Sequence, residues 1–362
     1  MRRTGEHLYQ LVQAYSALGD HRTGTPVDQT TIEWFATELG KRGARVDKVP
    51  YRFDRYVADC RLMAHGSEVE ALPLYYEAIG QVNSSRLHLA ELSIVSNLNA
   101  PQLDEIIARA RMSGTDAAIL ATTGAGGRLV ALNRAPILGS GFPTVLVPGS
   151  ALQTLTQAAV HLELDARLEP SESATVIGHL GQGDPASPVV LTTPLSGWFH
   201  CAGERGTGIA IALQLAEELA ERWPLMVVGT TGHELHFLGL RRFLVAHALQ
   251  PSAVIHLGAS LATTFTSIRL ALTTAGEGLV KRLEGILAPA GFPVRSNPAQ
   301  WLGEGEEWVR LSTPLLSLLG NFPLFHTPED LPEHSTSPEL LEVTHTAVSR
   351  AAQLFLEESL GH

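Results

Sequence analysis

The chain has 362 residues, of which 44% are hydrophobic, 17% are charged and 6% are aromatic. This length allows one large domain or two medium-sized ones with a substantial core. The net charge is -11 and no basic block interrupts it, which argues against nucleic acid or an anionic membrane as a partner.

The N-terminal residues are not expected to act as a secretory signal, because Arg2 and Arg3 are followed by no apolar run. No stretch reaches the roughly 18 apolar residues of a membrane helix. The two cysteines, Cys60 and Cys201, are expected to be reduced thiols and not a disulfide framework. Together these features predict a cytoplasmic protein.

The first 170 residues change in character along their length. Two amphipathic helices are predicted over 5–18 and 28–43, on either side of a turn-rich segment, and a strand follows over 44–53. Residues 50–170 then contain short runs typical of β-strands, which indicates a smaller β-rich module. Its predicted strands are 87–95, 117–122, 144–147 and 161–168, and its predicted helices are 101–113 and 150–159.

From residue 173 onward, strands and helices alternate. The predicted strands are 188–193, 225–230, 254–257, 267–273 and 314–319, and the predicted helices are 207–221, 238–248, 278–287 and 338–358. This alternation predicts an α/β fold with a mostly parallel sheet flanked by helices. We expect one domain made of residues 1–49 and 171–362, with residues 50–170 inserted as a smaller β-rich domain. In such sheets the functional site lies at the carboxyl ends of the strands.

Side chains able to bind a metal gather at or after the predicted strands. They lie in the segments His200–Glu204, His233–His236 and His326–Asp330 and at His256. A two-zinc hydrolase needs carboxylates and imidazoles that converge from separate loops, with a nearby acid as base. Each residue alone also fits a structural role, and Glu204 in particular is a candidate ion-pair partner for Arg205 or Arg22.

The order of these segments resembles the co-catalytic zinc aminopeptidase family. Its relatives include glutamate carboxypeptidase, glutaminyl cyclase and the non-catalytic transferrin receptor. The resemblance spans almost the whole chain and is carried by the segments His21–Pro26, Phe142–Val147, Ala174–Gly181, Ala202–Ile209 and Phe325–Asp330. It implies the zinc exopeptidase fold, with a protease-associated domain in residues 50–170.

The resemblance also implies that the first zinc has lost its ligands. Its histidine position is Pro194, its aspartate position is Gly258, and the aspartate that orients the histidine is replaced by Ser196. In the segment Thr231–Gly239, the position of the catalytic glutamate is occupied by His233. An imidazole there is able to act as a base or to become a metal ligand.

The ligands of the second zinc are all kept in kind. By the same resemblance they are Glu204, Glu234 and His326. Two carboxylates and one imidazole, with water in the fourth position, suit a single zinc ion. His200 and His236 are further candidates that the sequence does not place.

Three functions are compatible with this pattern. The losses favour a pseudo-enzyme, an aminopeptidase-like binding protein that is inactive as a two-zinc peptidase, and they leave at most one zinc ion as cofactor. The alternative is a one-zinc hydrolase or acyl-transfer enzyme, peptidase-like or glutaminyl cyclase-like, using Glu204, Glu234 and His326. A third is a two-zinc aminopeptidase with substitute ligands such as His200 or His256. The expected ligand is a peptide or a small amine, and the sequence predicts no oligomeric state.

Overall fold

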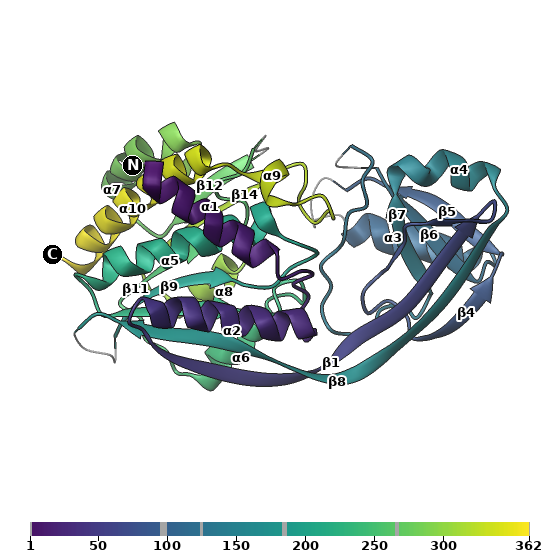
Figure 1. Cartoon of the computed structure of the whole chain (residues 1–362), viewed down its shortest axis with the longest axis horizontal. Helices are drawn as coiled ribbons and strands as arrows, with labels where there is room; N and C mark the ends of the chain where they lie inside the picture. The colour runs from purple at the N-terminus through teal and green to yellow at the C-terminus, as the bar shows by residue number, and fades with distance from the viewer. Residues whose placement is uncertain (1, 95–99, 124–125, 183–186, 265–267, 362) are drawn as a thin grey trace.

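A computed structural model describes residues 2–94, 100–123, 126–182, 187–264 and 268–361. It shows a larger body and a smaller one, each built around its own sheet (Figure 1). The large sheet has the order β13-β12-β14-β11-β9-β10-β8-β1-β2, with β4 also paired to β8. Its strands are β1 (Arg45–Ala64), β2 (Ser67–Val69), β4 (Gly80–Ser84), β8 (Val160–Leu180), β9 (Val189–Pro194), β10 (Leu225–Thr230), β11 (Ala253–Leu257), β12 (Ile268–Thr273), β13 (Val294–Ser296) and β14 (Leu315–Asn321).

The central strands β14, β11, β9 and β10 run parallel to one another, and the strands that flank them, β12 and β8, pair with them antiparallel. Helices cover this sheet on both faces. One layer holds α1 (Arg2–Ser16), α2 (Pro26–Lys41), α5 (Thr207–Ala220), α7 (Glu277–Leu287) and α10 (Pro338–Leu360), and the other holds α6 (Leu238–Ala246) and α8 (Gly305–Trp308). The predicted fold class, a mostly parallel sheet flanked by helices with a smaller β-rich part, is confirmed.

Strand β9 shows why the two layers form. Its residues Val189 and Leu191 belong to one hydrophobic core and Val190 to the other, because successive side chains of a strand point to opposite faces. Every residue of this strand is buried. A continuous buried run of this kind is typical of a parallel strand covered on both sides.

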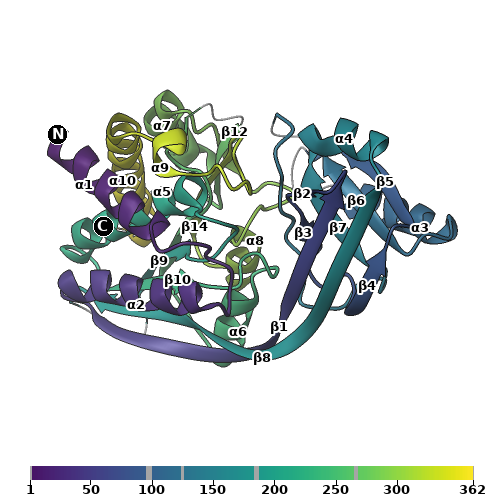
Figure 2. The ribbon, with the colours of Figure 1, turned by 45° about the vertical axis from the view of Figure 1, so that its right-hand side comes forward.

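Two long antiparallel strands connect the bodies. β1 and β8 pair from Arg45 with His179 to Ala64 with Val160, and they curve from the large sheet into the smaller body (Figure 2). The strands predicted over 44–53 and 161–168 are therefore parts of much longer ones. The predicted boundaries near residues 50 and 170 fall inside these strands, and the division into two domains stays a prediction.

The smaller body contains the second sheet, ordered β3-β7-β6-β5. Its elements are β3 (Leu72–Pro73), β5 (Leu87–Leu92), β6 (Ala117–Thr122) and β7 (Thr144–Pro148), with α3 (Ala100–Met112) and α4 (Leu152–Gln157). The sequence did not predict β2, β3, β4, β13 or the short helix α8, and a further short helix, α9 (Pro332–Ser335), follows Asp330. The predicted strand ends Val95 and Ser267 lie outside the described residues. Among the described helices, none has the length and apolar character needed to span a bilayer.

Candidate functional site

The carboxyl ends of three neighbouring parallel strands define the candidate site. Pro194 ends β9, Thr230 ends β10 and Leu257 ends β11. A cluster of polar side chains is buried at or just beyond these ends. Its members are Glu204, Arg205, His233, Glu234, His256, Glu304 and His326. Buried charged side chains therefore gather at the carboxyl ends of the parallel strands, where the sequence predicts the site.

Glu204 and Arg205 form an ion pair at the centre of this cluster. Both lie in the π-helical turn Ala202–Gly206 that leads into α5, and their exposed fractions are 0% and 1%. Arg205 Nη2 lies 2.6 Å from Glu204 Oε1, and Arg205 Nε donates to the carbonyl oxygen of Ser196 at 2.9 Å. The alternative role expected for Glu204, an ion pair with Arg205, is confirmed.

The turn that carries this pair is held by Asp330. The Asp330 carboxylate accepts hydrogen bonds from the backbone N–H of Gly203 at 2.6 Å and of Glu204 at 3.0 Å. It also accepts from the Ser335 hydroxyl at 2.6 Å. Asp330 thus fixes the backbone that aims Glu204 into the site.

His326 contacts the same oxygen of the Glu204 carboxylate as Arg205 does. Its Nε2 lies 3.2 Å from Glu204 Oε1, and its Nδ1 lies 3.0 Å from the carbonyl oxygen of Ala131. A carbonyl oxygen only accepts, so Nδ1 carries a proton and Nε2 faces the carboxylate. Burial alone would raise the pKa of Glu204, but Arg205 and His326 lower it to about 2. Glu204 is therefore ionised at neutral pH.

Glu234 is bonded away from this pair. Its Oε1 accepts from the backbone N–H of Thr23 at 2.6 Å, and its Oε2 accepts from the Ser196 hydroxyl at 2.8 Å. Burial raises the pKa of Glu234 in spite of these hydrogen bonds. Each carboxylate oxygen is thus engaged with a protein donor. Ser196, which by resemblance replaces the aspartate that orients the first-zinc histidine, donates its hydroxyl hydrogen to Glu234.

His233 is paired with a carboxylate that the sequence did not single out. His233 Nδ1 lies 3.2 Å from Glu304 Oε1, and Glu304 also accepts from the Thr230 hydroxyl at 2.8 Å. Burial, followed by the nearby Arg205 charge, lowers the pKa of His233 well below its usual value, so the imidazole is neutral. Burial raises the pKa of Glu304. In the sequence, Glu304 lies in an acidic, glycine-containing run that is typical of a solvated turn, and only the fold brings it to the end of β10.

His256 fills the space beside Gly258, where the resemblance implies a lost aspartate. Its Nδ1 lies 2.8 Å from the Ser317 hydroxyl, and burial lowers its pKa to about 4. A Cβ placed on Gly258 would come within 3.0 Å of His256 Cε1 and 3.1 Å of the Leu318 carbonyl oxygen. An aspartate would therefore not fit there without displacing these groups.

The remaining candidate histidines lie elsewhere. His200 Nδ1 contacts the carbonyl oxygen of Ser16 at 3.0 Å. His236 is half-buried, and its pKa is lowered by burial and then by the positive charges of Arg241 and Arg134. Within the described residues, neither histidine forms a hydrogen bond or an ion pair with Glu204 or His326. The structure thus brings together Glu204, Arg205 and His326, with His233 and Glu304 beside them.

The smaller body also takes part in the site. The Ala131 N–H donates to the carbonyl oxygen of His326 at 2.9 Å, and the Arg134 N–H donates to that of Glu234 at 3.0 Å. Asn133 Oδ1 accepts from Trp198 Nε1 at 2.9 Å. Residues 131–134 therefore anchor the inserted part of the chain to two of the predicted ligand residues.

As arranged, the predicted ligands do not fit a zinc ion. Zinc sites use at least three protein ligands, yet Glu234 is engaged elsewhere and a guanidinium occupies one side of Glu204. Within the part of the chain that the structure describes, no group of three or more His, Cys, Asp or Glu is placed to hold a metal ion. A site on Glu204, Glu234 and His326 stays a prediction, of which only the contact between Glu204 and His326 is present.

Comparison with known proteins supports the fold. No protein-family profile and no curated protein sequence matches the chain. Among solved structures, a zinc aminopeptidase from Bacillus subtilis has a TM-score of 0.75 at 17% identity, covering 96% of this chain and 94% of its own. A peptidase M28 precursor from Shewanella amazonensis has a TM-score of 0.71 at 16% identity, with 98% and 96% covered.

A glutaminyl cyclase from Porphyromonas gingivalis is a more distant match. Its TM-score is 0.53 at 11% identity, and 96% of this chain and 97% of its own are covered. The chain therefore has the co-catalytic zinc exopeptidase fold, as the sequence motifs predicted. At these identities the similarity establishes the fold, and the chemistry has to be argued from the site itself.

Proposed function

We propose that this chain is a non-hydrolytic binding protein on the zinc exopeptidase fold. In this proposal the Arg205 guanidinium supplies the positive charge that bound zinc supplies in the metallopeptidases. The observation that carries it is the buried ion pair, with 2.6 Å between Arg205 Nη2 and Glu204 Oε1. Glu204 occupies the position that, by resemblance, would bridge two metal ions.

Electrostatics makes the guanidinium and a metal ion mutually exclusive at this carboxylate. Two like charges a few ångströms apart repel strongly where water is excluded, and both side chains here are buried. The positions that would hold the first zinc ion do not compensate for this repulsion, because Pro194 and Gly258 have no side chain that can bind a metal ion. Glu234 would have to break its bonds to Thr23 and Ser196 before it could turn toward a metal ion.

Without a metal ion, the site lacks the Lewis acid that lowers the pKa of an attacking water molecule. Zinc lowers the pKa of its bound water to near neutrality, which no uncharged side chain achieves alone. His233 is a neutral imidazole held against Glu304, and no carboxylate stands at the base position. We therefore expect a protein that binds a peptide or a small amine and leaves it intact.

The alternative, a one-zinc hydrolase or acyl-transfer enzyme, is favoured by one feature of His326. Metal-binding histidines usually donate one ring N–H to a backbone carbonyl or carboxylate and present the other nitrogen to the metal. His326 has this arrangement, with Nδ1 on Ala131 and Nε2 toward Glu204. For zinc to bind there, Arg205 would have to withdraw.

Turnover measurements separate the two functions. Purified protein supplied with zinc would be assayed on aminoacyl substrates and on N-terminal glutamine peptides, beside Glu204→Gln and His233→Ala purified in parallel. The proposal predicts that all three give the same background rate. Turnover that is present in the parent and lost in both variants would establish the hydrolase or acyl-transfer alternative.

A further inference from the structure

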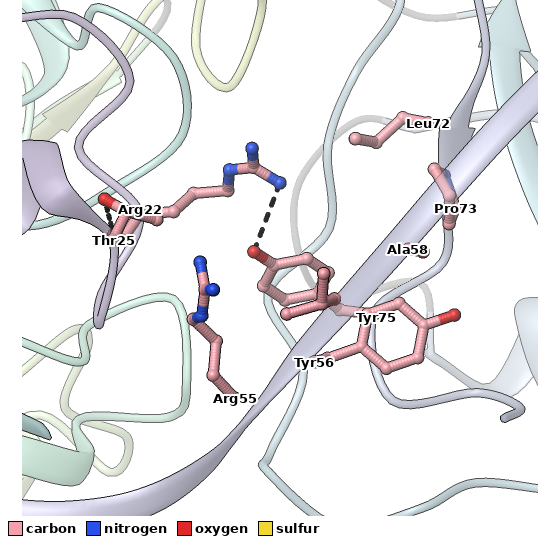
Figure 3. A pocket seen from close by; sticks show the side chains of 9 residues that line it. Arg22, Thr25, Arg55, Tyr56, Ala58, Leu72, Pro73 and Tyr75 are labelled. Atoms are coloured by element: carbon pink, nitrogen blue, oxygen red, sulfur yellow. Dashed lines mark hydrogen bonds between the residues drawn. The ribbon is translucent and has the colours of Figure 1, made fainter. Parts of the chain in front are cut away.

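A small pocket lies where the N-terminal loop of the larger body meets the smaller body (Figure 3). Its volume is about 100 Å³. Arg22 comes from the loop before α2, Arg55 and Tyr56 come from β1, and Leu72, Pro73 and Tyr75 come from the segment around β3. None of the residues that line this pocket belongs to the cluster around Glu204.

Two guanidinium groups and one phenol converge in this pocket. Figure 3 shows the Arg22 and Arg55 side chains pointing toward the same space, where the Tyr75 hydroxyl is joined to Arg22 by a hydrogen bond. Arg22 Nη1 donates to the Tyr75 hydroxyl oxygen at 3.3 Å. The two arginine side chains are 31% and 25% exposed, so solvent reaches them only in part.

Each arginine is held by a single carboxylate outside the pocket. Arg22 Nε lies 2.9 Å from Asp20 Oδ2, and Arg55 Nη2 lies 3.4 Å from Glu169 Oε2. A guanidinium has five N–H donors, so these ion pairs leave several donors unused. Arg55 Nε is buried and has no hydrogen-bond partner among the described residues.

The Tyr75 hydroxyl is a further donor. Burial raises the pKa of Tyr75 to about 12, even though the Arg22 charge acts to lower it. The phenol therefore keeps its proton at neutral pH. It accepts from Arg22, and its own hydrogen is available to an anion.

Packing holds these groups in place before any ligand arrives. Gly24 has a φ of +79°, and a Cβ on it would lie 2.7 Å from the Phe53 ring and 3.2 Å from Arg55 Cδ. The absence of a side chain at Gly24 lets the Arg55 stem pass close to the loop that carries Arg22. The Tyr75 ring packs against Trp198 with 4.5 Å between the ring centres. A preorganised pocket loses less conformational entropy when it binds.

We propose that this pocket binds a small carboxylate ligand, with the carboxylate between the Arg22 and Arg55 guanidiniums and a short aliphatic part against Leu72 and Pro73. The planar fork of a guanidinium matches the two oxygens of a carboxylate. Leu72 and Pro73 supply an apolar wall and no side-chain donor. The wall suits an aliphatic group better than the additional oxygens of a phosphate.

The test is a titration of the full chain with three probes, in which binding is detected by calorimetry or by the NMR shifts of the probe. Isobutyrate has the proposed chemistry, isobutyramide is its neutral isostere, and inorganic phosphate carries charge without an apolar part. We expect saturable binding of isobutyrate and weaker binding of the other two. Equal binding of the amide would overturn the charge argument, and tighter binding of phosphate would identify a phosphate site instead.

Matched variants locate the binding. Arg55→Gln should weaken isobutyrate binding about tenfold or more, because a charge-assisted pair is lost. Arg52→Gln is the control, since Arg52 is 89% exposed on the same strand and is paired with Glu172 at 3.3 Å on β8. An equal loss in both variants would show that the anion binds by general charge, and the proposal would fail. If Arg55→Gln does not fold, Arg22→Gln makes the same test.

Discussion

Arg205 is the residue on which the chemistry of the site turns. It is almost fully buried, which is rare for arginine, and it is the ion-pair partner that balances the buried carboxylate of Glu204. Removing one member of a buried ion pair leaves an uncompensated charge, whereas removing both is far less costly. This asymmetry gives a prediction about stability that does not depend on finding a ligand.

Arg205→Met keeps most of the side-chain volume and removes the charge. We expect it to lower the free energy of unfolding by about 3–5 kcal/mol, since the buried Glu204 carboxylate loses its guanidinium partner. Adding Glu204→Gln to Arg205→Met should restore most of that loss. Denaturant unfolding of the parent, both single variants and the double variant measures this coupling, and a loss below roughly 0.5 kcal/mol in Arg205→Met would contradict the assigned role.

His21 provides a prediction about pH. It is buried, stacks on Tyr15 with 3.8 Å between ring centres, and places Nδ1 at 2.8 Å from the Thr31 hydroxyl. Burial lowers its pKa from 6.5 to about 3. Between pH 3 and pH 6.5, His21 is protonated in the unfolded chain and neutral in the folded chain. The stability that the neutral His21 contributes is therefore fully present above pH 6.5 and is lost as the pH falls toward 3.

His21→Phe should therefore flatten the decline of stability below pH 6.5, with a difference of up to about 4 kcal/mol between the ends of that window. His7→Phe, at an exposed position of α1, is the control and should leave the decline unchanged. Unfolding free energies measured at several pH values provide the comparison. Parallel curves for the parent and His21→Phe would exclude a buried neutral imidazole at this position.

Only part of the residue-scale account could be predicted from the sequence. Glu204 and His326 meet as expected, because their segments follow strands whose ends share one edge of the sheet. Glu304 was not predicted, since an acidic turn on a loop is usually solvated. The hydrogen bonds that turn Glu234 toward Thr23 join residues far apart in sequence, and no local pattern encodes them.

At the scale of elements, the turn before α5 depends on Asp330. Asp330→Asn would replace one carboxylate oxygen by an NH₂ group, which cannot accept from the N–H of Gly203 or Glu204. A buried donor left without a partner costs about 1–3 kcal/mol, and we expect a loss of that size in the free energy of unfolding. Glu329→Gln, at the neighbouring and less buried position, is the matched control. Equal stability of Asp330→Asn and the parent would show that the hydrogen bonds from Gly203 and Glu204 to Asp330 do not stabilise the fold.

The segment 131–134 ties the smaller body to the site, and this tie is testable by hydrogen exchange. Asn133→Ala removes the acceptor for Trp198 Nε1. We expect faster exchange of the Ala131 and Arg134 amides, because their hydrogen bonds to His326 and Glu234 would open more often. Unchanged exchange at both amides would mean that the anchoring does not depend on Asn133.

Element prediction succeeded where hydrophobic patterning was strong. The buried strands β9, β10 and β11 and the helices between them follow the expected alternation closely. The full length of β1 and β8 was not predicted, because their middle parts are rich in charged residues that face solvent. Long antiparallel pairing stabilises such segments through backbone hydrogen bonds, which leave little trace in composition.

At the scale of the whole molecule, the zinc exopeptidase fold contains a buried polar cluster in which the Arg205 guanidinium lies beside the Glu204 carboxylate. The order of motifs along the chain was sufficient to predict the fold, which the solved structures match over nearly their full length. The arrangement of the inserted part over the site was not predictable, since it depends on long-range contacts such as that between Ala131 and His326. Its assignment as a protease-associated domain stays a prediction.

The central claim is that Arg205 takes the place of the metal ion, and zinc content tests it most directly. The purified chain would be loaded with zinc, desalted and analysed for metal per chain, beside Glu204→Gln and Glu234→Ala. The account predicts that the parent retains no more zinc than either variant. One zinc ion per chain in the parent, lost in both variants, would contradict it and would show that Glu204, Glu234 and His326 form a metal site.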